Sequence, residues 1–293
     1  MFGRIGRRTR VGLITLGLVA ASALGLSAGS APAAAVGAGP GYLALGDSVV
    51  FGFITKAGFE YGNANNFVGY PAYAGADLKL NTVNASCPGE ATTSFISATG
   101  VDNGCRAFRS AAPLHVAYTG TQLAFATAFL KAHPNTRLVT IGLGANDAFI
   151  LQDACATAVN PALCIQAGLV TLLPQISRNM DTILKAIRPV FHGLLVVVNY
   201  YSLDYSDNAG TTFTEALNQA VTAPAQADGA VVANAFAAFQ AASNTTLAGH
   251  NTCRAGLLNA SPPNQYLCDV HPSQSGQQLL ASTVEQVVEA NSP

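Results

Sequence analysis

The sequence contains no tryptophan, and only 10% of its 293 residues are Asp, Glu, Lys or Arg. Because the 14 basic and 15 acidic residues nearly balance, the composition argues against the basic surface of a nucleic-acid-binding protein. Six cysteines are too few for a disulfide-framework mini-protein. Half of the residues are apolar, which argues against a disordered chain. The composition indicates a globular protein with a large core, and we expect no nucleic-acid partner.

Long uncharged apolar runs are missing after the first 35 residues, so no later segment predicts a membrane span. Within those 35 residues, four arginines precede an apolar run over residues 11–26, and small residues follow at 27–35. This order is typical of a secretory signal peptide. We predict that residues 1–35 are a signal peptide cleaved near Ala33 or Ala35, and an uncleaved membrane anchor is the alternative. The arginines are Arg4, Arg7, Arg8 and Arg10.

Removal of this segment leaves residues 36–293, which we expect to form a single domain. The four arginines leave with it, so ten basic residues remain against 15 acidic ones and the net charge becomes −5. We predict a secreted, extracellular monomer that has no stable membrane anchor after cleavage.

An exported chain folds in an oxidising compartment, where an even number of cysteines indicates disulfides. Fifteen pairings of six cysteines are possible, and the spacing in three local couples favours one pairing. That pairing is Cys87–Cys105, Cys155–Cys164 and Cys253–Cys268. A metal site is the competing interpretation, but no Cys-x-x-Cys or clustered Cys/His pattern supports it.

Short apolar runs alternate with longer amphipathic ones, which predicts a parallel sheet with helices on both faces. The expected strands are residues 42–45, 82–85, 137–141, 194–199 and 230–233. The expected helices are residues 66–78, 121–132, 172–187, 212–227 and 273–290, the last with Ser273 as N-cap. Residues 148–169 are expected to form an insertion or lid-like loop. Because parallel sheets bind ligands beyond the carboxyl ends of their strands, functional residues should follow strands.

Polar segments follow three of the expected strands. In the first, Gly46 permits a tight turn and the hydroxyl of Ser48 would face the crevice, although a helix cap is the simpler interpretation of such a serine. In the second, the backbone N–H of Gly89 can face a developing oxyanion, or Gly89 belongs to an ordinary disulfide-pinned turn. In the third, Asn146 offers an amide donor on a glycine-rich turn, or forms an Asn/Asp turn.

A fourth polar segment precedes the final expected helix. His271 lies there beside a cysteine, with Asp269 two residues earlier. An imidazole on a disulfide-anchored loop with a nearby carboxylate is suited to act as an oriented base, and a surface turn is the alternative. The remaining histidines lack comparable neighbours, and we interpret them as structural or exposed: His115, His133, His192 and His250.

Together, the four segments resemble the GDSL or SGNH family of serine hydrolases, and most of all its secreted bacterial branch. The resemblance covers residues 42–281. The four residues that give the SGNH family its name correspond to Ser48, Gly89, Asn146 and His271. It implies a three-layer α/β/α fold with a central parallel five-stranded sheet, the flavodoxin-like SGNH-hydrolase fold. It also implies Ser48 as the nucleophile, His271 as the general base, and an oxyanion hole of Ser48, Gly89 and Asn146. No metal or organic cofactor is implied.

One position departs from the family pattern. The family places the triad aspartate three residues before the histidine, where this chain has Cys268. We favour Asp269 as the group that orients His271, and a main-chain carbonyl near Cys268 is the alternative. We interpret Asp47 and Asp147 as local hydrogen-bond partners that hold the Ser48 and Asn146 turns.

The resemblance implies a lipase or carboxylesterase that cleaves an ester or lipid through an acyl-enzyme. Apolar residues near the motifs suggest an acyl pocket, although such residues more often belong to the core: Val49, Val50, Phe51, Phe53 and Phe149. The absence of tryptophan, which often stacks on sugars, weighs slightly against a carbohydrate O-deacetylase. A phospholipase and a non-catalytic secreted binding protein remain alternatives.

Overall fold

The structure is a computed structural model that describes residues 39–261 and 264–292. The chain divides into two units, Met1–Ala35 and Val36–Pro293, and the described residues belong to the second. The expected signal peptide, residues 1–35, lies outside the described residues. Within those residues, no helix is both long and apolar enough to cross a membrane.

Five parallel strands form the central sheet, in the order β2-β1-β3-β4-β5. Their bounds are β1 Gly41–Gly46, β2 Asn81–Asn84, β3 Thr136–Gly142, β4 Leu194–Val198 and β5 Val231–Ala233. The register places Leu43 of β1 opposite Val83 of β2 and Val139 of β3. The parallel sheet expected from the alternating pattern is therefore confirmed.

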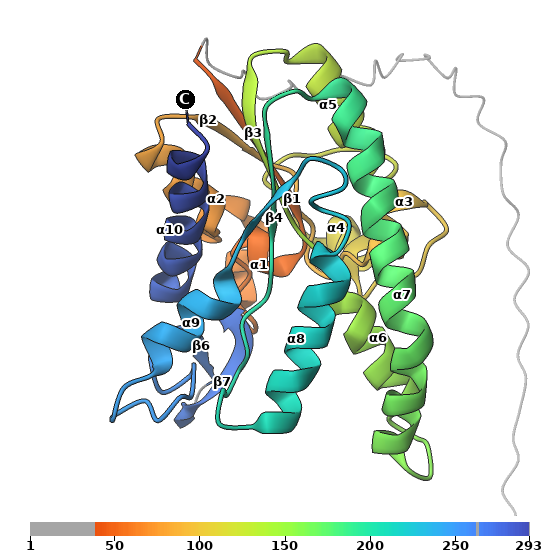
Figure 1. The fold of residues 1–293 in the computed structure, drawn as a ribbon, viewed down its shortest axis with the longest axis vertical. Helices are drawn as coiled ribbons and strands as arrows, with labels where there is room; N and C mark the ends of the chain where they lie inside the picture. The colour runs from red at the N-terminus through yellow and green to blue at the C-terminus, as the bar shows by residue number, and fades with distance from the viewer. Residues whose placement is uncertain (1–38, 262–263, 293) are drawn as a thin grey trace, which may run out of the picture. The chain divides into compact units, whose positions relative to one another are not determined.

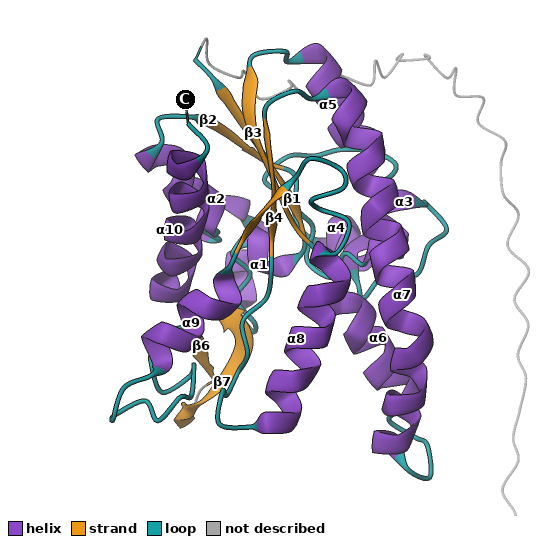
Figure 2. Cartoon of the chain, viewed as in Figure 1, coloured by secondary structure: helices purple, strands orange, loops and turns teal. Residues whose placement is uncertain are grey.

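Helices cover both faces of this sheet (Figures 1 and 2), with α5, α7 and α8 on one face and α2, α9 and α10 on the other. The longer helices are α2 Tyr70–Asp77, α5 Gln122–Ala132, α6 Ala145–Cys155, α7 Pro161–Ile187, α8 Asn208–Thr222, α9 Ala235–Ser243 and α10 Gln274–Ala290. Shorter helices are α1 Ser48–Phe51, α3 Thr92–Ile96 and α4 Cys105–Ala111, and 3-10 turns lie at Gly58–Gly62, Ala64–Asn66 and Arg188–Val190. A separate antiparallel hairpin joins β6 Leu258–Ser261 and β7 Asn264–Pro272.

Alternate residues of the buried strands supply two separate cores. Leu43 and Leu45 of β1 pack toward α5, α7 and α8, whereas Tyr42 of the same strand packs toward α2, α9 and α10. Successive side chains of a strand point to opposite faces, so a sheet covered on both sides needs apolar residues at nearly every position. The central strand β4, Leu194–Val198, therefore reads as a continuous apolar run because the fold has three layers.

The prediction of an insertion or lid-like loop at residues 148–169 is wrong. This segment is helical: α6 runs to Cys155 and α7 begins at Pro161, and the Cys155–Cys164 disulfide joins the two helices. Asn160 caps α7 by accepting a hydrogen bond from the Leu163 N–H, and Pro161 occupies the first turn, where a missing N–H is harmless. The Asn-Pro pair was the available signal, and the small residues around it obscured the helical pattern.

Further elements differ from the sequence-based expectations. The helix expected at residues 66–78 begins only at Tyr70, because Phe67 and Gly69 have extended backbone. The β6–β7 hairpin and α9 were not expected. By contrast, the final helix begins as expected, with the Ser273 hydroxyl accepting from the Gly276 N–H.

Candidate active site

Ser48 begins α1, directly where the carboxyl end of β1 turns into that helix. Gly46 has a φ of +140° in this turn, and a Cβ there would lie 2.0 Å from the Gly142 carbonyl oxygen of β3. Only glycine fits this close approach. The next residue, Asp47, caps α1 by accepting from the Val49 N–H at 2.9 Å. The turn therefore holds Ser48 at the edge of the sheet where ligands bind.

His271 faces Ser48 across 223 positions of sequence. Its Nε2 lies 3.0 Å from the Ser48 Oγ, the distance of a hydrogen bond between a nucleophile and its base. The histidine lies on β7, which the Cys253–Cys268 disulfide fixes and α10 follows. The ring of Phe53 meets the imidazole edge-on, with 5.0 Å between the ring centroids.

Two oxygen atoms share the other imidazole nitrogen. Asp269 Oδ1 and Thr55 Oγ1 each lie 3.3 Å from His271 Nδ1. Asp269 Oδ1 also accepts the His271 backbone N–H at 2.6 Å, so the carboxylate is fixed beside the ring. Burial raises the pKa of Asp269, but the hydrogen bonds from the His271 side chain and backbone outweigh burial, and the net pKa lies below its ordinary value. Among the described residues, no main-chain carbonyl partners Nδ1.

The Asn146 side chain connects the three turns that follow β1, β2 and β3. Its Nδ2 donates to the Glu90 carbonyl oxygen at 3.0 Å and to Asp47 Oδ2 at 3.4 Å. Its Oδ1 accepts from Asn103 Nδ2 at 2.9 Å, and this partner was not expected from the sequence. The amide nitrogen is therefore held between the Glu90 carbonyl oxygen and the carboxylate of Asp47, the residue before Ser48.

Gly89 has a φ of +84°, in the left-handed region, within the turn after β2. An added Cβ would lie 2.3 Å from the Asn103 carbonyl oxygen, so the chain passes too close for any side chain. The Asn103 N–H in turn donates to the Gly89 carbonyl at 2.8 Å. Gly89, which was expected to carry an oxyanion donor, thus lies in a constrained turn. This turn bonds to Asn103, the residue that also bonds to Asn146.

Two buried aspartates support these turns. Burial raises the pKa of Asp47 to about 6, although hydrogen bonds from Tyr200 and Val49 act against this. Burial also raises the pKa of Asp147, which accepts both the backbone N–H and the hydroxyl of Thr92. Asp47 holds the Ser48 turn as expected, whereas Asp147 ties α6 to the first turn of α3.

An apolar cavity of about 290 Å³ opens beside Ser48 and His271. Of the residues expected to form an acyl pocket, Val49 and Phe149 line it. Val50 and Phe51 do not, because both are fully buried core residues, and Phe53 packs on His271 instead. Further apolar lining residues, which sequence reasoning missed, are Tyr200, Tyr201, Leu203, Phe213, Leu217 and Val270.

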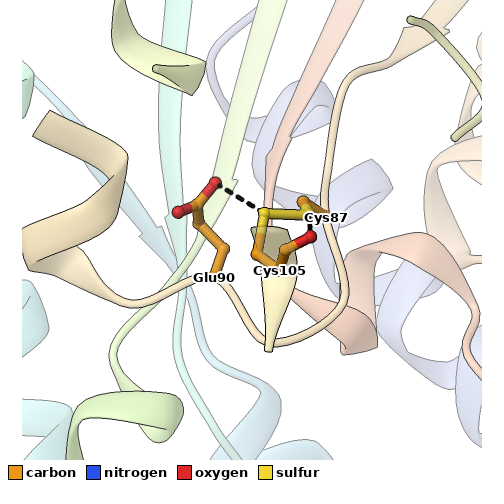
Figure 3. A group of neighbouring side chains, drawn as sticks. All are labelled: Cys87, Glu90 and Cys105. Carbon is orange, nitrogen blue, oxygen red and sulfur yellow. Dashed lines mark hydrogen bonds between the residues drawn. A yellow bond between two sulfur atoms is a disulfide. The ribbon is translucent and has the colours of Figure 1, made fainter. Parts of the chain in front are cut away.

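The expected disulfides are all present: Cys87–Cys105, Cys155–Cys164 and Cys253–Cys268. The first lies against the buried carboxylate of Glu90, as Figure 3 shows. Burial raises the pKa of Glu90 to about 7, although hydrogen bonds from Ser94 and Gln122 lower it. Cys87, Glu90 and Cys105 are close enough to form a candidate metal site. Their sulfur atoms are bonded to each other, however, and thiolates are the sulfur ligands that metals require.

Two of the four other histidines bond to backbone carbonyl oxygens. His115 Nε2 bonds to the Phe51 carbonyl oxygen at 3.0 Å, and burial lowers its pKa. His133 Nδ1 bonds to the Phe129 carbonyl oxygen within its own helix turn. These contacts are structural, as the sequence indicated.

The structure resembles several solved esterases and lipases. Phospholipase A1 from Streptomyces albidoflavus NA297 aligns with a TM-score of 0.54 and 20% identity, over 87% of this chain and 100% of that one. An acetylxylan esterase from Geobacillus stearothermophilus aligns with a TM-score of 0.53 and 15% identity, over 86% and 94%. A lipase from a goat rumen metagenome aligns with a TM-score of 0.52 and 16% identity, over 84% and 96%. At these identities, the likeness establishes the three-layer SGNH-hydrolase fold.

Sequence comparisons supply the family. No curated protein sequence matches this chain. The model of the GDSL-like lipase/acylhydrolase family matches residues 44–279, which include all four polar segments. The chain therefore belongs to the GDSL-like lipase/acylhydrolase family, and it is a hydrolase of that family.

Proposed function

We propose that this hydrolase is a secreted serine carboxylesterase or lipase that forms an acyl-enzyme on Ser48. The observation that carries the proposal is the 3.0 Å contact between Ser48 Oγ and His271 Nε2 at an apolar cavity. A hydroxyl beside an imidazole, with a carboxylate at the second ring nitrogen, is the arrangement that activates a serine nucleophile.

The positions of these groups support the following reaction. His271 Nε2 accepts the Ser48 proton as Oγ attacks the ester carbonyl, and the same proton then passes to the departing alcohol. The carbonyl oxygen gains negative charge in this step, and the Ser48 and Gly89 N–H groups and the Asn146 amide would stabilise it. Water, deprotonated by His271, then releases the acid and restores Ser48.

Asp269 would hold the imidazole in the correct tautomer and stabilise its protonated form. The contact that supports this role is the 3.3 Å approach of Oδ1 to Nδ1, together with the lowered pKa of Asp269, which keeps the carboxylate charged. The Thr55 hydroxyl at the same nitrogen would assist in orienting the ring.

The cavity supports a substrate with an apolar acyl or alcohol group. Its walls include Val49, Phe149, Phe213 and Leu217, and burial of apolar groups contributes about 0.8 kcal/mol per methylene. We therefore favour esters and lipids that carry an apolar acyl or alcohol group over acetylated sugars. Secretion is supported by three disulfides, which persist in oxidising compartments.

A chain-length series of p-nitrophenyl esters tests this proposal, beside a phospholipid and an acetylated sugar. We expect hydrolysis of the p-nitrophenyl esters to exceed hydrolysis of the acetylated sugar. Ser48→Ala should lower kcat by at least about 10⁴-fold. Ser110→Ala, which removes an exposed hydroxyl that donates to the Ala107 carbonyl oxygen within α4, should leave kcat unchanged. Undiminished hydrolysis by Ser48→Ala contradicts the proposal.

A further inference from the structure

A buried tyrosine hydroxyl bonds to the aspartate of the nucleophile turn. Tyr200 follows β4, and its hydroxyl donates to Asp47 Oδ2 at 2.6 Å. Both residues are almost fully buried, with 6% of Tyr200 and 1% of Asp47 exposed. A short hydrogen bond to a carboxylate is stronger than one between neutral groups, and a buried carboxylate depends on such donors.

Asp47 connects this tyrosine to the turn that carries Ser48 and to the Asn146 amide. Its Oδ1 accepts the Val49 N–H at 2.9 Å and thereby fixes the turn that carries Ser48. Its Oδ2 accepts from the Asn146 amide at 3.4 Å, on the same oxygen atom that Tyr200 bonds. A shift of this carboxylate would therefore displace the nucleophile turn and the amide donor together.

The backbone of Tyr200 is itself held from α8. Its N–H donates to Asn218 Oδ1 at 2.8 Å, and Asn218 Nδ2 donates to the Tyr200 carbonyl at 2.7 Å. The buried side-chain amide of Asn218 thus bonds to the Tyr200 backbone through both its oxygen and its nitrogen. This double contact fixes the backbone of Tyr200 relative to α8.

We propose that Tyr200 is a positioning residue for the reaction: through its hydrogen bond to Asp47 it holds the Ser48 turn and the Asn146 amide in the reactive arrangement. The inference rests on the proposed function, because it concerns the same nucleophile. Tyr200 also lines the cavity, but the role proposed for it runs through Asp47 and assigns it no contact with the reacting atoms.

The electrostatics of Asp47 make this role measurable. Burial raises the pKa of Asp47 to about 6, whereas the Tyr200 hydroxyl, the Val49 N–H and the charge of His271 lower it. Asp147 faces the same carboxyl and raises its pKa, and Tyr70 and Tyr201 are the neighbouring tyrosines. Loss of the Tyr200 hydroxyl removes a lowering contact, so the pKa of Asp47 moves above 6 and the group is protonated at a higher pH.

Tyr200→Phe tests the proposal through the pH dependence of kcat. We expect kcat for a p-nitrophenyl ester to fall by at least about 10-fold near pH 6.5 and KM to change much less. The deficit should shrink toward pH 9, where Asp47 loses its proton again. The control is Tyr42→Phe, which removes another buried hydroxyl, bonded to Thr140 on the opposite face of the sheet. It should leave the pH profile unchanged.

The outcomes separate the two proposals. Absence of Ser48-dependent hydrolysis in the wild-type protein contradicts the proposed function itself. With hydrolysis present, an equal deficit of Tyr200→Phe at every pH, or the same pH shift in Tyr42→Phe, overturns the role of Tyr200. Asp47→Asn supplies an independent variant if Tyr200→Phe does not fold: its kcat should fall at least about 10-fold with little change in KM. An unchanged kcat in Asp47→Asn also overturns the inference.

Discussion

At His271, two side chains meet the nitrogen that faces away from Ser48. Asp269 and Thr55 lie at the same 3.3 Å distance from Nδ1, but they differ in charge. A carboxylate stabilises the imidazolium that forms when His271 accepts a proton, whereas a neutral hydroxyl contributes only a hydrogen bond. Asp269 should therefore matter far more to catalysis than its equal distance suggests.

Asp269→Asn and Thr55→Ala measure this difference. We expect Asp269→Asn to lower kcat by about 10⁴-fold, the typical effect of neutralising a triad carboxylate. Thr55→Ala removes one hydrogen bond worth about 1 kcal/mol, so kcat should fall no more than about 10-fold. The measurement is steady-state hydrolysis of a p-nitrophenyl ester. A nearly intact kcat in Asp269→Asn would show that the carboxylate does not orient His271.

The residues of the site differ in how much of their role the sequence reveals. Ser48, Asn146 and His271 lie in short polar motifs beside glycine, cysteine or proline, and the structure brings Ser48 and His271 into contact. Tyr200 and Asn103 lie in ordinary sequence surroundings. Their contacts depend on side-chain directions across the fold, which local sequence does not determine.

At the scale of elements, the α6–α7 hairpin carries a residue of the site at one end and a disulfide at the other. Asn146 lies in the first turn of α6, where Glu90 and Asn103 hold it. The Cys155–Cys164 disulfide closes the far end of the helix over a sequence separation of nine. The stability of the hairpin and the position of Asn146 should therefore be largely independent.

Replacing both Cys155 and Cys164 by serine tests this independence. Closing so short a loop stabilises the folded state by about 2–3 kcal/mol, so Tm should fall by roughly 5–10 °C. We expect kcat to stay within about threefold of the wild-type value. Thermal melting and ester hydrolysis on the same sample provide both numbers. A loss of kcat as large as that of Asn146→Ala would show that the hairpin end also positions the amide.

The elements that the sequence predicts are those with one dominant local signal. β4 is an apolar run because both faces of the sheet are covered, and α10 begins at a serine cap. The β6–β7 hairpin has irregular pairing, with register shifts on either side of Ala260, so it lacks a clean alternating pattern. The Cys253–Cys268 disulfide was predictable, but the position of the hairpin also depends on packing against α10, which is not a local signal.

At the scale of the whole molecule, strand order brings the site together. The chain adds β2 on one side of β1 and β3 on the other, so the loops after β1 and β3 part at their carboxyl ends. Such a switch point is where open α/β sheets bind ligands. Ser48 follows β1 and Asn146 follows β3, and the β6–β7 hairpin supplies His271 from outside the sheet. Parallel pairing was predictable from the sequence, whereas the contribution of a separate hairpin was not.

Reaction of the intact protein with a fluorophosphonate probe, followed by mass spectrometry of its peptides, tests the central claim most directly. An activated serine attacks the probe, whereas an ordinary hydroxyl or a non-catalytic binding protein does not. We predict one label, on Ser48, with the label absent in Ser48→Ala and retained in Ser110→Ala. A wild-type protein that stays unlabelled, or a Ser48→Ala variant that is labelled as fast as the wild type, would contradict the assignment of Ser48 as the nucleophile.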